Sequence, residues 1–195
     1  MRILKKLFVS AVRIKILDLM LLDPTKSLHV RAIVRRVGAE INAVRRELEN
    51  LTNIGLFTRR RSSNRLYYTV DTNHVFYSEL LSLLSKERGL GAEIIKNIDS
   101  LGDVEFAILS LEFLRGRKAT ALDVDLFLVG DIDTEALELL VKVQEKVLNR
   151  EVNFSVMASE DFRHRKRKHD QFVFKVLAQG RCMLVGDDQS FHSIV

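Results

Sequence analysis

Two aspartates in the second half of the chain have the types and spacing that could do chemistry. Asp123 and Asp125 fall within the apolar run 122–129, which predicts a buried strand. Side chains two residues apart on a strand point to the same face. The two carboxylates could therefore share Mg²⁺, which binds hard oxygen ligands. Two such ions would clamp a transferring nucleotidyl phosphate and its leaving group. The pair alone is a weak signal, because most such pairs simply end a strand at the solvent.

A second set of residues, in the first half, has the chemistry of DNA recognition. An apolar stripe at helical spacing predicts a helix over residues 41–53. Arginine can pair bidentately with guanine, and asparagine with adenine. At about 100° per residue, the positions opposite the stripe are Asn42, Ala43, Arg46, Asn50 and Asn53, with Arg45 at the edge. This face predicts contact with base edges, so Arg46→Ala should weaken binding and relax base preference.

More arginines flank this helix in the sequence. Two strand-like runs, 56–60 and 66–70, surround the polar turn 61–64 and predict a hairpin. Arginines around its tip would lie over phosphates or in the minor groove, and those of a preceding helix would clamp the backbone. The hairpin set is Arg59, Arg60, Arg61 and Arg65, and the helix set is Arg31, Arg35 and Arg36. The alternative is that these arginines contact no partner and simply form a solvated, charged face.

The elements that position these residues are three helices, near 10–22, 31–37 and 41–53, followed by the hairpin. That is the order of a winged helix-turn-helix, whose third helix enters the major groove. The run Val44-Arg45-Arg46-Glu47-Leu48-Glu49-Asn50-Leu51, then Gly55-Leu56 and Arg65-Leu66-Tyr67-Tyr68, resembles ArsR/MarR-like transcriptional regulators. The resemblance implies binding to double-stranded DNA. Many winged-helix regulators act as dimers, so we expect a homodimer, with the leucines of 80–84 as core or as the dimer seam.

The second half resembles another family. Arg115-Gly116, a six-residue spacer and Asp123-Val124-Asp125 are similar to the nucleotidyltransferase domain of the DNA polymerase β superfamily, over about residues 102–186. In active members a Gly-Ser pair before the Arg-Gly holds the triphosphate, but here the position reads Leu111-Glu112. The family's third carboxylate matches Asn153, with Glu151 as a substitute. The resemblance therefore implies an inactive domain without catalytic residues, in which Asp123 and Asp125 could still bind Mg²⁺ weakly.

Alternating strands and helices in the second half indicate an α/β arrangement. The expected fold class is α+β with two domains: a winged helix-turn-helix over residues 1–88, and a nucleotidyltransferase-like α/β domain with a small mixed sheet over 89–195.

Charge and composition support this division. The chain has 195 residues and a formal net charge of +5. Residues 1–75 hold 15 Lys/Arg against 6 Asp/Glu, whereas residues 76–195 hold 16 against 20. A basic first half points to nucleic acid. With one cysteine, no transmembrane run and no signal peptide, the expected location is the cytoplasm, without a membrane partner.

Three functions of different classes remain open from the sequence. The first is a DNA-binding transcriptional regulator whose second domain senses, dimerises or binds a partner. The second is an active, metal-dependent nucleotidyltransferase that the winged helix guides. The third is an interaction module that binds neither DNA nor nucleotide.

Overall fold

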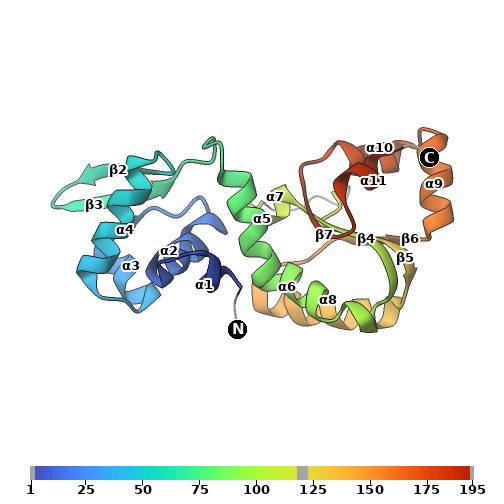
Figure 1. The fold of residues 1–195 in the computed structure, drawn as a ribbon, viewed down its shortest axis with the longest axis horizontal. Coiled ribbons are helices and arrows are strands. Elements are labelled where there is room, and N and C mark those ends of the chain that lie inside the picture. Colours follow the sequence, from blue (N-terminus) through green and yellow to red (C-terminus); the bar gives the residue numbers. More distant parts are fainter. Residues whose placement is uncertain (1–2, 118–122, 194–195) are drawn as a thin grey trace. The chain divides into compact units, whose positions relative to one another are not determined.

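The computed structural model describes residues 3–117 and 123–193, and the chain divides into two compact units, Met1–Glu87 and Arg88–Val195. The fold is α+β, with eleven α-helices and two small sheets in the described residues. Figure 1 shows the ribbon of each unit, and each is described here by itself.

The first unit contains three helices that pack together, a three-stranded sheet and a following helix. Its elements are α1 (Leu4–Leu7), α2 (Ala11–Leu21), β1 (Leu28–His29), α3 (Val30–Val37), α4 (Ile41–Asn53), β2 (Phe57–Ser62), β3 (Arg65–Val70) and α5 (Tyr77–Glu87). The Ser10 side chain caps α2 by accepting a hydrogen bond from the Arg13 N–H at 3.2 Å. Gly38 ends α3 in the left-handed conformation, at φ 59°.

The core of this unit lies where α2, α3 and α4 contact one another. Ile16, Ile33 and Leu48 are fully buried there. The sheet has the order β1-β3-β2, and both pairs are antiparallel. The hairpin turn is shorter than the sequence predicts, because Arg61 and Ser62 still pair with β3. Ser63 makes the turn at φ 51°, so a two-residue connection is enough.

The leucines of α5 divide between core and surface. Leu81 and Leu84 are buried, Leu80 is half-buried, and Leu83 is 41% exposed. The Tyr77 hydroxyl, also buried, donates a hydrogen bond to the Leu21 carbonyl of α2 at 3.2 Å. The Tyr77 hydrogen bond thus ties the start of α5 to α2 of its own unit.

The second unit is built around a four-stranded sheet of order β6-β5-β4-β7, in which β5 and β6 are parallel and the other pairs antiparallel. Its elements are α6 (Gly89–Lys96), the 3₁₀ helix η1 (Ile98–Ser100), β4 (Gly102–Ser110), α7 (Leu111–Leu114), β5 (Leu126–Ile132), α8 (Thr134–Leu148), β6 (Phe154–Met157), α9 (Ser159–Arg167), α10 (Gln171–Ala178), β7 (Arg181–Val185) and α11 (Asp188–His192).

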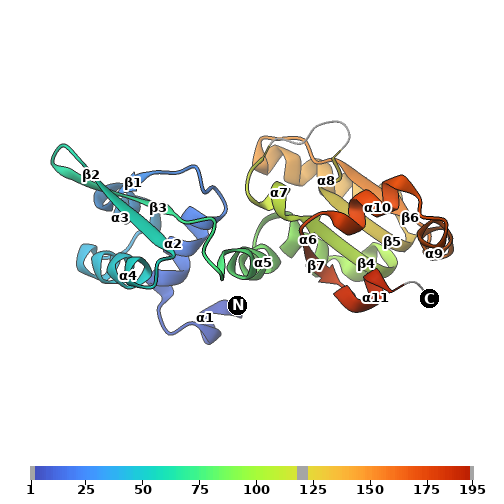
Figure 2. The ribbon, with the colours of Figure 1, turned by 90° about the horizontal axis from the view of Figure 1, so that it is seen from above.

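Helices cover both faces of this sheet. On one face α9, α10 and α11 lie over a cluster rich in phenylalanine (Figures 1 and 2). Phe127 of β5, Phe162 of α9 and Phe191 of α11 are almost fully buried in it, with ring centroids 5.2 to 6.5 Å apart. On the other face lie α6 and α8, which contact each other. Both faces of the sheet are therefore covered by helices.

The strand predicted over 122–129 is wrong at its start. β5 begins only at Leu126, where pairing with Phe154 of β6 begins. Asp123 and Asp125 therefore precede the strand instead of sharing one of its faces, and residue 122 lies outside the described residues.

Candidate nucleic-acid interface

The side chains that the sequence assigns to DNA contact are all exposed in the first unit. They are Arg31, Arg35, Arg36, Asn42, Arg45, Arg46, Asn50, Arg59, Arg60, Arg61 and Arg65. In the described part of the chain, none of the nine arginines among them forms an ion pair with a carboxylate. Their charge is thus available to an anionic partner.

Four of these arginines, from different elements, line one hollow of about 680 Å³. We call this the arginine hollow; Arg31 comes from α3, Arg45 from α4, and Arg59 and Arg65 from the hairpin strands. Tyr68 also lines it and is only 6% exposed. Burial raises the pKa of the Tyr68 hydroxyl, although Arg59 and Arg45 oppose that shift, so this hydroxyl stays protonated and neutral.

The hollow also contains residues that the sequence analysis did not assign to DNA. His29 and Asn64 line it, and so does one carboxylate, Glu49. His29 caps α3 with its Nδ1 atom, which accepts a hydrogen bond from the Ala32 N–H at 3.2 Å. Only the antiparallel pairing of β1 with β3 brings His29 beside Tyr67. Sequence spacing gives no sign of that contact.

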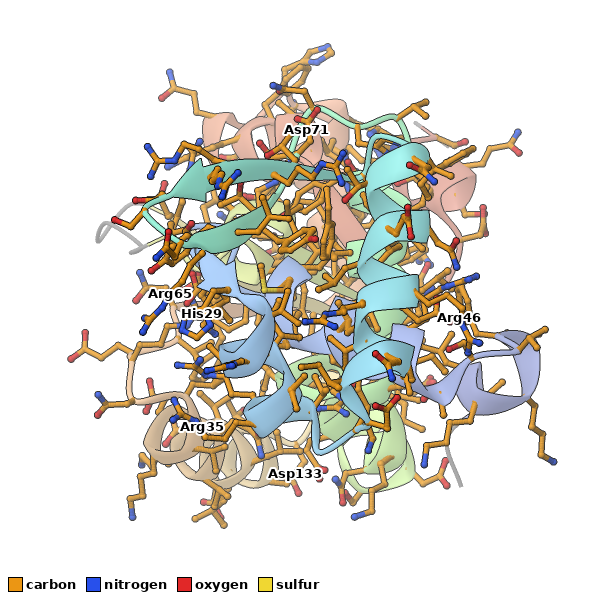
Figure 3. All side chains as sticks on the ribbon, turned by 90° about the vertical axis from the view of Figure 1, so that its left-hand side faces the viewer. His29, Arg35, Arg46, Arg65, Asp71 and Asp133 are labelled. Carbon is orange, nitrogen blue, oxygen red and sulfur yellow. The ribbon has the colours of Figure 1, made fainter. Side chains whose placement is uncertain are left out.

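The remaining predicted residues lie outside the arginine hollow. Figure 3 shows His29 and Arg65 close together on one side of α4, and Arg46 on the opposite flank of that helix. Arg45, placed at the edge of the predicted face, is the α4 arginine that lines the hollow with the hairpin. Arg60 alternates with Arg59 along β2, so the two side chains point to opposite faces of the sheet.

Two carboxylates fix the position of α4. Glu40 caps its first turn: one oxygen accepts hydrogen bonds from the N–H groups of Asn42 and Ala43 at 2.8 and 3.0 Å, which lowers the Glu40 pKa. Glu47 is 3% exposed and accepts a hydrogen bond from Arg13 Nε of α2 at 2.8 Å. Burial opposes ionisation of Glu47, but its hydrogen bonds outweigh burial and lower its pKa. Glu40 thus stabilises the first turn of α4, and the Glu47–Arg13 contact holds the helix against α2.

The two aspartates of the second unit have different surroundings. Asp125 is 4% exposed, and its carboxylate accepts a hydrogen bond from the Asn153 N–H at 2.9 Å. Burial raises the pKa of Asp125, and Asp123 adds to the shift, while the Asn153 bond and the Arg150 charge oppose it. Asp123 is more exposed and lies 3.4 Å from the Lys175 ammonium.

Asp125 also borders a hollow of about 310 Å³ with Arg117, Arg150, Glu151 and Asn153. The Arg150 guanidinium donates a hydrogen bond to the Phe113 carbonyl at 2.7 Å and lies 3.8 Å from the centre of the Phe113 ring. A cation supplied by the chain is thus already present beside Asp125.

The Leu111-Glu112 pair opens α7, directly after β4. The Glu112 carboxylate lies 2.9 Å from Arg115 and 2.7 Å from Arg117. Within the described ranges, no group of three His, Cys, Asp or Glu residues is placed to hold a metal ion. Asp123 lies beside the Lys175 ammonium and Asp125 beside the Arg150 charge, so each aspartate already has a cation of the chain close to it.

The basic side chains of residues 163–169 have different surroundings in the fold. Arg163 pairs with Glu105 at 2.9 Å, and Arg165 with Asp161 at 3.0 Å. Lys166 is 4% exposed, and its ammonium donates a hydrogen bond to the Phe191 carbonyl at 2.8 Å. Much of the charge in this run is therefore already paired within the second unit.

Comparisons of the chain with models of protein families, with curated proteins and with solved structures gave no match. Among the helices that the structure describes, none is both long and apolar enough to cross a membrane.

Proposed function

We propose that the chain is a transcriptional regulator whose first unit binds double-stranded DNA as a winged helix-turn-helix. The observation that carries the proposal is the arginine hollow, where four arginines from α3, α4 and the hairpin converge around one carboxylate, Glu49, and none of the four forms an ion pair in the described residues. Clustered arginines on one face are the electrostatic footprint of a nucleic-acid-binding surface.

Each part of this surface has a separate role in the proposal. Arg45 of α4 and Arg59 and Arg65 of the hairpin contact phosphates on either side of a groove, which fixes the position of the protein on DNA. The exposed side chains Asn42, Arg46 and Asn50 of α4 have the donors and acceptors to read base edges in the major groove. Anchoring of α4 through Glu47 and Arg13 keeps this face fixed.

A DNA titration across a salt series tests the proposal. We expect the full chain to bind the promoter region of its own gene more tightly than unrelated DNA of equal length. The affinity should fall steeply as salt rises, because counterions are released from the phosphates that the arginines neutralise. Equal affinity for both DNAs, or no binding at low salt, would overturn the regulator proposal.

Variants of single arginines locate the surface. Arg45→Ala and Arg65→Ala should each lower the affinity about tenfold and reduce the salt slope by about one. Arg46→Ala should weaken binding and relax base preference, since Arg46 lies on the outer face of α4. Lys86→Ala is the matched control, because this exposed lysine of α5 lies outside the hollow. An equal loss in the Lys86 variant would contradict the assigned surface.

For the second unit we propose a nucleotidyltransferase-like domain that no longer transfers nucleotides. The pairing of Glu112 with Arg115 and Arg117 supports this, because a carboxylate at that position repels a triphosphate and engages both cations. A binding screen with nucleoside triphosphates and Mg²⁺ or Mn²⁺ checks it. Tight metal-dependent binding would favour the active nucleotidyltransferase instead.

A further inference from the structure

α8 of the second unit carries an apolar stripe that faces solvent. Leu139, Val143 and Val147 are 66%, 58% and 72% exposed. They lie four residues apart, so they form one row of about 12 Å along the helix. Large apolar side chains that are exposed singly are common, but a row of them along one helix marks a contact surface.

The stripe is separate from the side of α8 that belongs to the core. Leu137 and Val141 are buried at 0% and 2% exposure and hold the helix on the sheet. In Figure 1 α8 runs along the lower border of the second unit, below the sheet strands. Residues of the stripe therefore do not stabilise the unit that carries them.

The charges beside the stripe are divided between the two ends of the helix. Glu135 and Glu138 lie in its N-terminal half, and Lys142 and Lys146 in its C-terminal half, all exposed. Glu138 and Lys142 form an ion pair along the helix at 3.4 Å, and an exposed pair of this kind is weak enough to exchange for a pair between helices. Glu145, also in the C-terminal half, is partly buried and accepts a hydrogen bond from the Val152 N–H at 2.8 Å.

When two copies of α8 pack antiparallel, the acidic half of each faces the basic half of the other. In the register that pairs these charges, Leu139 of one copy lies opposite Val143 of the other, and Val147 lies at the end of the contact, level with Glu135 of the other copy. The antiparallel helix dipoles also attract each other.

We infer that two copies of this chain associate through antiparallel packing of α8. A twofold contact requires a surface that is complementary to itself. The exposed face of α8 meets that requirement, because the apolar stripe is flanked by acidic residues towards one end and by basic residues towards the other. A parallel arrangement would place like charges together at both ends. The same charge pattern therefore selects a second copy as the partner and sets its direction.

Sedimentation of the full chain tests whether this surface is used. We expect the native chain to be a dimer at ~100 µM and Val143→Glu to be a monomer at the same concentration. Phe174→Glu is the control, because Phe174 of α10 is 49% exposed in the same unit but lies outside the stripe. A monomeric native chain, or a Val143 variant as dimeric as the native chain, would overturn the inference.

Complementary charge variants test the antiparallel direction. A basic variant carries Glu135→Lys and Glu138→Lys, and an acidic variant carries Lys142→Glu and Lys146→Glu. Each alone should associate at least tenfold more weakly, because equal charges then meet along the whole contact. In a parallel pair like charges would already face each other in the native chain, so neither variant alone would then associate more weakly than the native chain. A mixture of the two should form heterodimers as tightly as the native dimer. Undiminished association of either variant alone, or no recovery in the mixture, with both variants showing native circular dichroism, would refute the antiparallel contact.

Discussion

Glu49 is the single carboxylate among the residues that line the arginine hollow. Its charge lowers the positive potential there, so it weakens attraction for phosphates of any sequence. Glu49→Gln should raise the affinity for unrelated DNA about threefold at low salt, because one repulsive charge is removed. The gain should be about the same for the promoter of its own gene, so the ratio of the two affinities should stay nearly unchanged.

A matched variant separates this local effect from a change in net charge. Glu79→Gln removes the same charge from α5, outside the hollow. It should leave both affinities nearly unchanged. Weaker binding of Glu49→Gln to unrelated DNA would mean that Glu49 supports the surface instead of restraining it.

Asp125 should make the second unit less stable as the pH rises. Its folded pKa is raised, chiefly by burial, above the value of about 3.8 expected in the unfolded chain. Between those two pKa values the folded state binds more protons than the unfolded state, so the free energy of unfolding falls with increasing pH. Asp125→Asn keeps an oxygen that can accept the Asn153 hydrogen bond but removes the charge.

We therefore expect Asp125→Asn to be more stable than the native chain at pH 7. The advantage should shrink as the pH falls through the folded pKa and vanish near the unfolded pKa. Denaturant unfolding at a series of pH values checks this. A variant that is less stable at pH 7 would show that attraction to Arg150 outweighs burial.

At the scale of elements, the β4–β5 pair depends on two glycines. A Cβ atom on Gly130, which has φ 147°, would lie 2.1 Å from the Asp103 carbonyl oxygen of β4. In the same way, a Cβ atom on Gly102 would lie 2.2 Å from the Asp131 carbonyl oxygen of β5. Both close contacts involve backbone atoms, which cannot rotate away as a side chain does.

Gly130→Ala should thus destabilise the second unit by about 3 kcal/mol, from backbone strain and overpacking. Gly89→Ala is the control in the same unit: Gly89 also has positive φ, but its Cβ would have no neighbour within 4 Å. It should cost only about 1 kcal/mol. Equal losses in denaturant unfolding would show that conformation alone, and not the close strand approach, requires glycine at position 130.

The same scale shows what the sequence could and could not predict. The helix expected over 41–53 has those bounds in the structure, because its apolar stripe matches the packed face and Gly55 follows it at φ 80°. The start of β5 could not be predicted, because it depends on where the parallel partner β6 begins to pair. Apolar residues occur both before and after Leu126, so the composition of the sequence does not mark the start of the strand.

The candidate interface was predictable in composition but not in geometry. All nine assigned arginines are exposed, as their positions in the expected elements imply. A helical projection placed Arg45 at the edge of the α4 face, yet the hairpin folds towards that edge and makes it part of the hollow. Which flank of a helix a hairpin approaches is decided by long-range packing, and residue spacing does not contain that information.

At the scale of the whole molecule, the proposed DNA-binding surface and the proposed dimer contact lie in different units. Residues 1–75 carry the excess of positive charge, whereas α8 belongs to the second unit. In a dimer two basic units share one assembly, so binding of the first raises the effective concentration of the second near the same DNA. Affinity for a site with two half-sites should then depend on α8, although α8 touches no DNA.

Val143→Glu should therefore lower the affinity for the promoter of its own gene about a hundredfold. Affinity for a fragment too short for two half-sites should stay at the native value, because the arginine hollow is unchanged. Titrations on both DNAs, with the stoichiometry measured in each, check this: two native chains should bind the promoter together, and the variant should bind one chain at a time. If the variant also lost affinity for the short fragment, α8 would be in direct contact with DNA. If the variant kept the native affinity for the promoter, each first unit would bind independently.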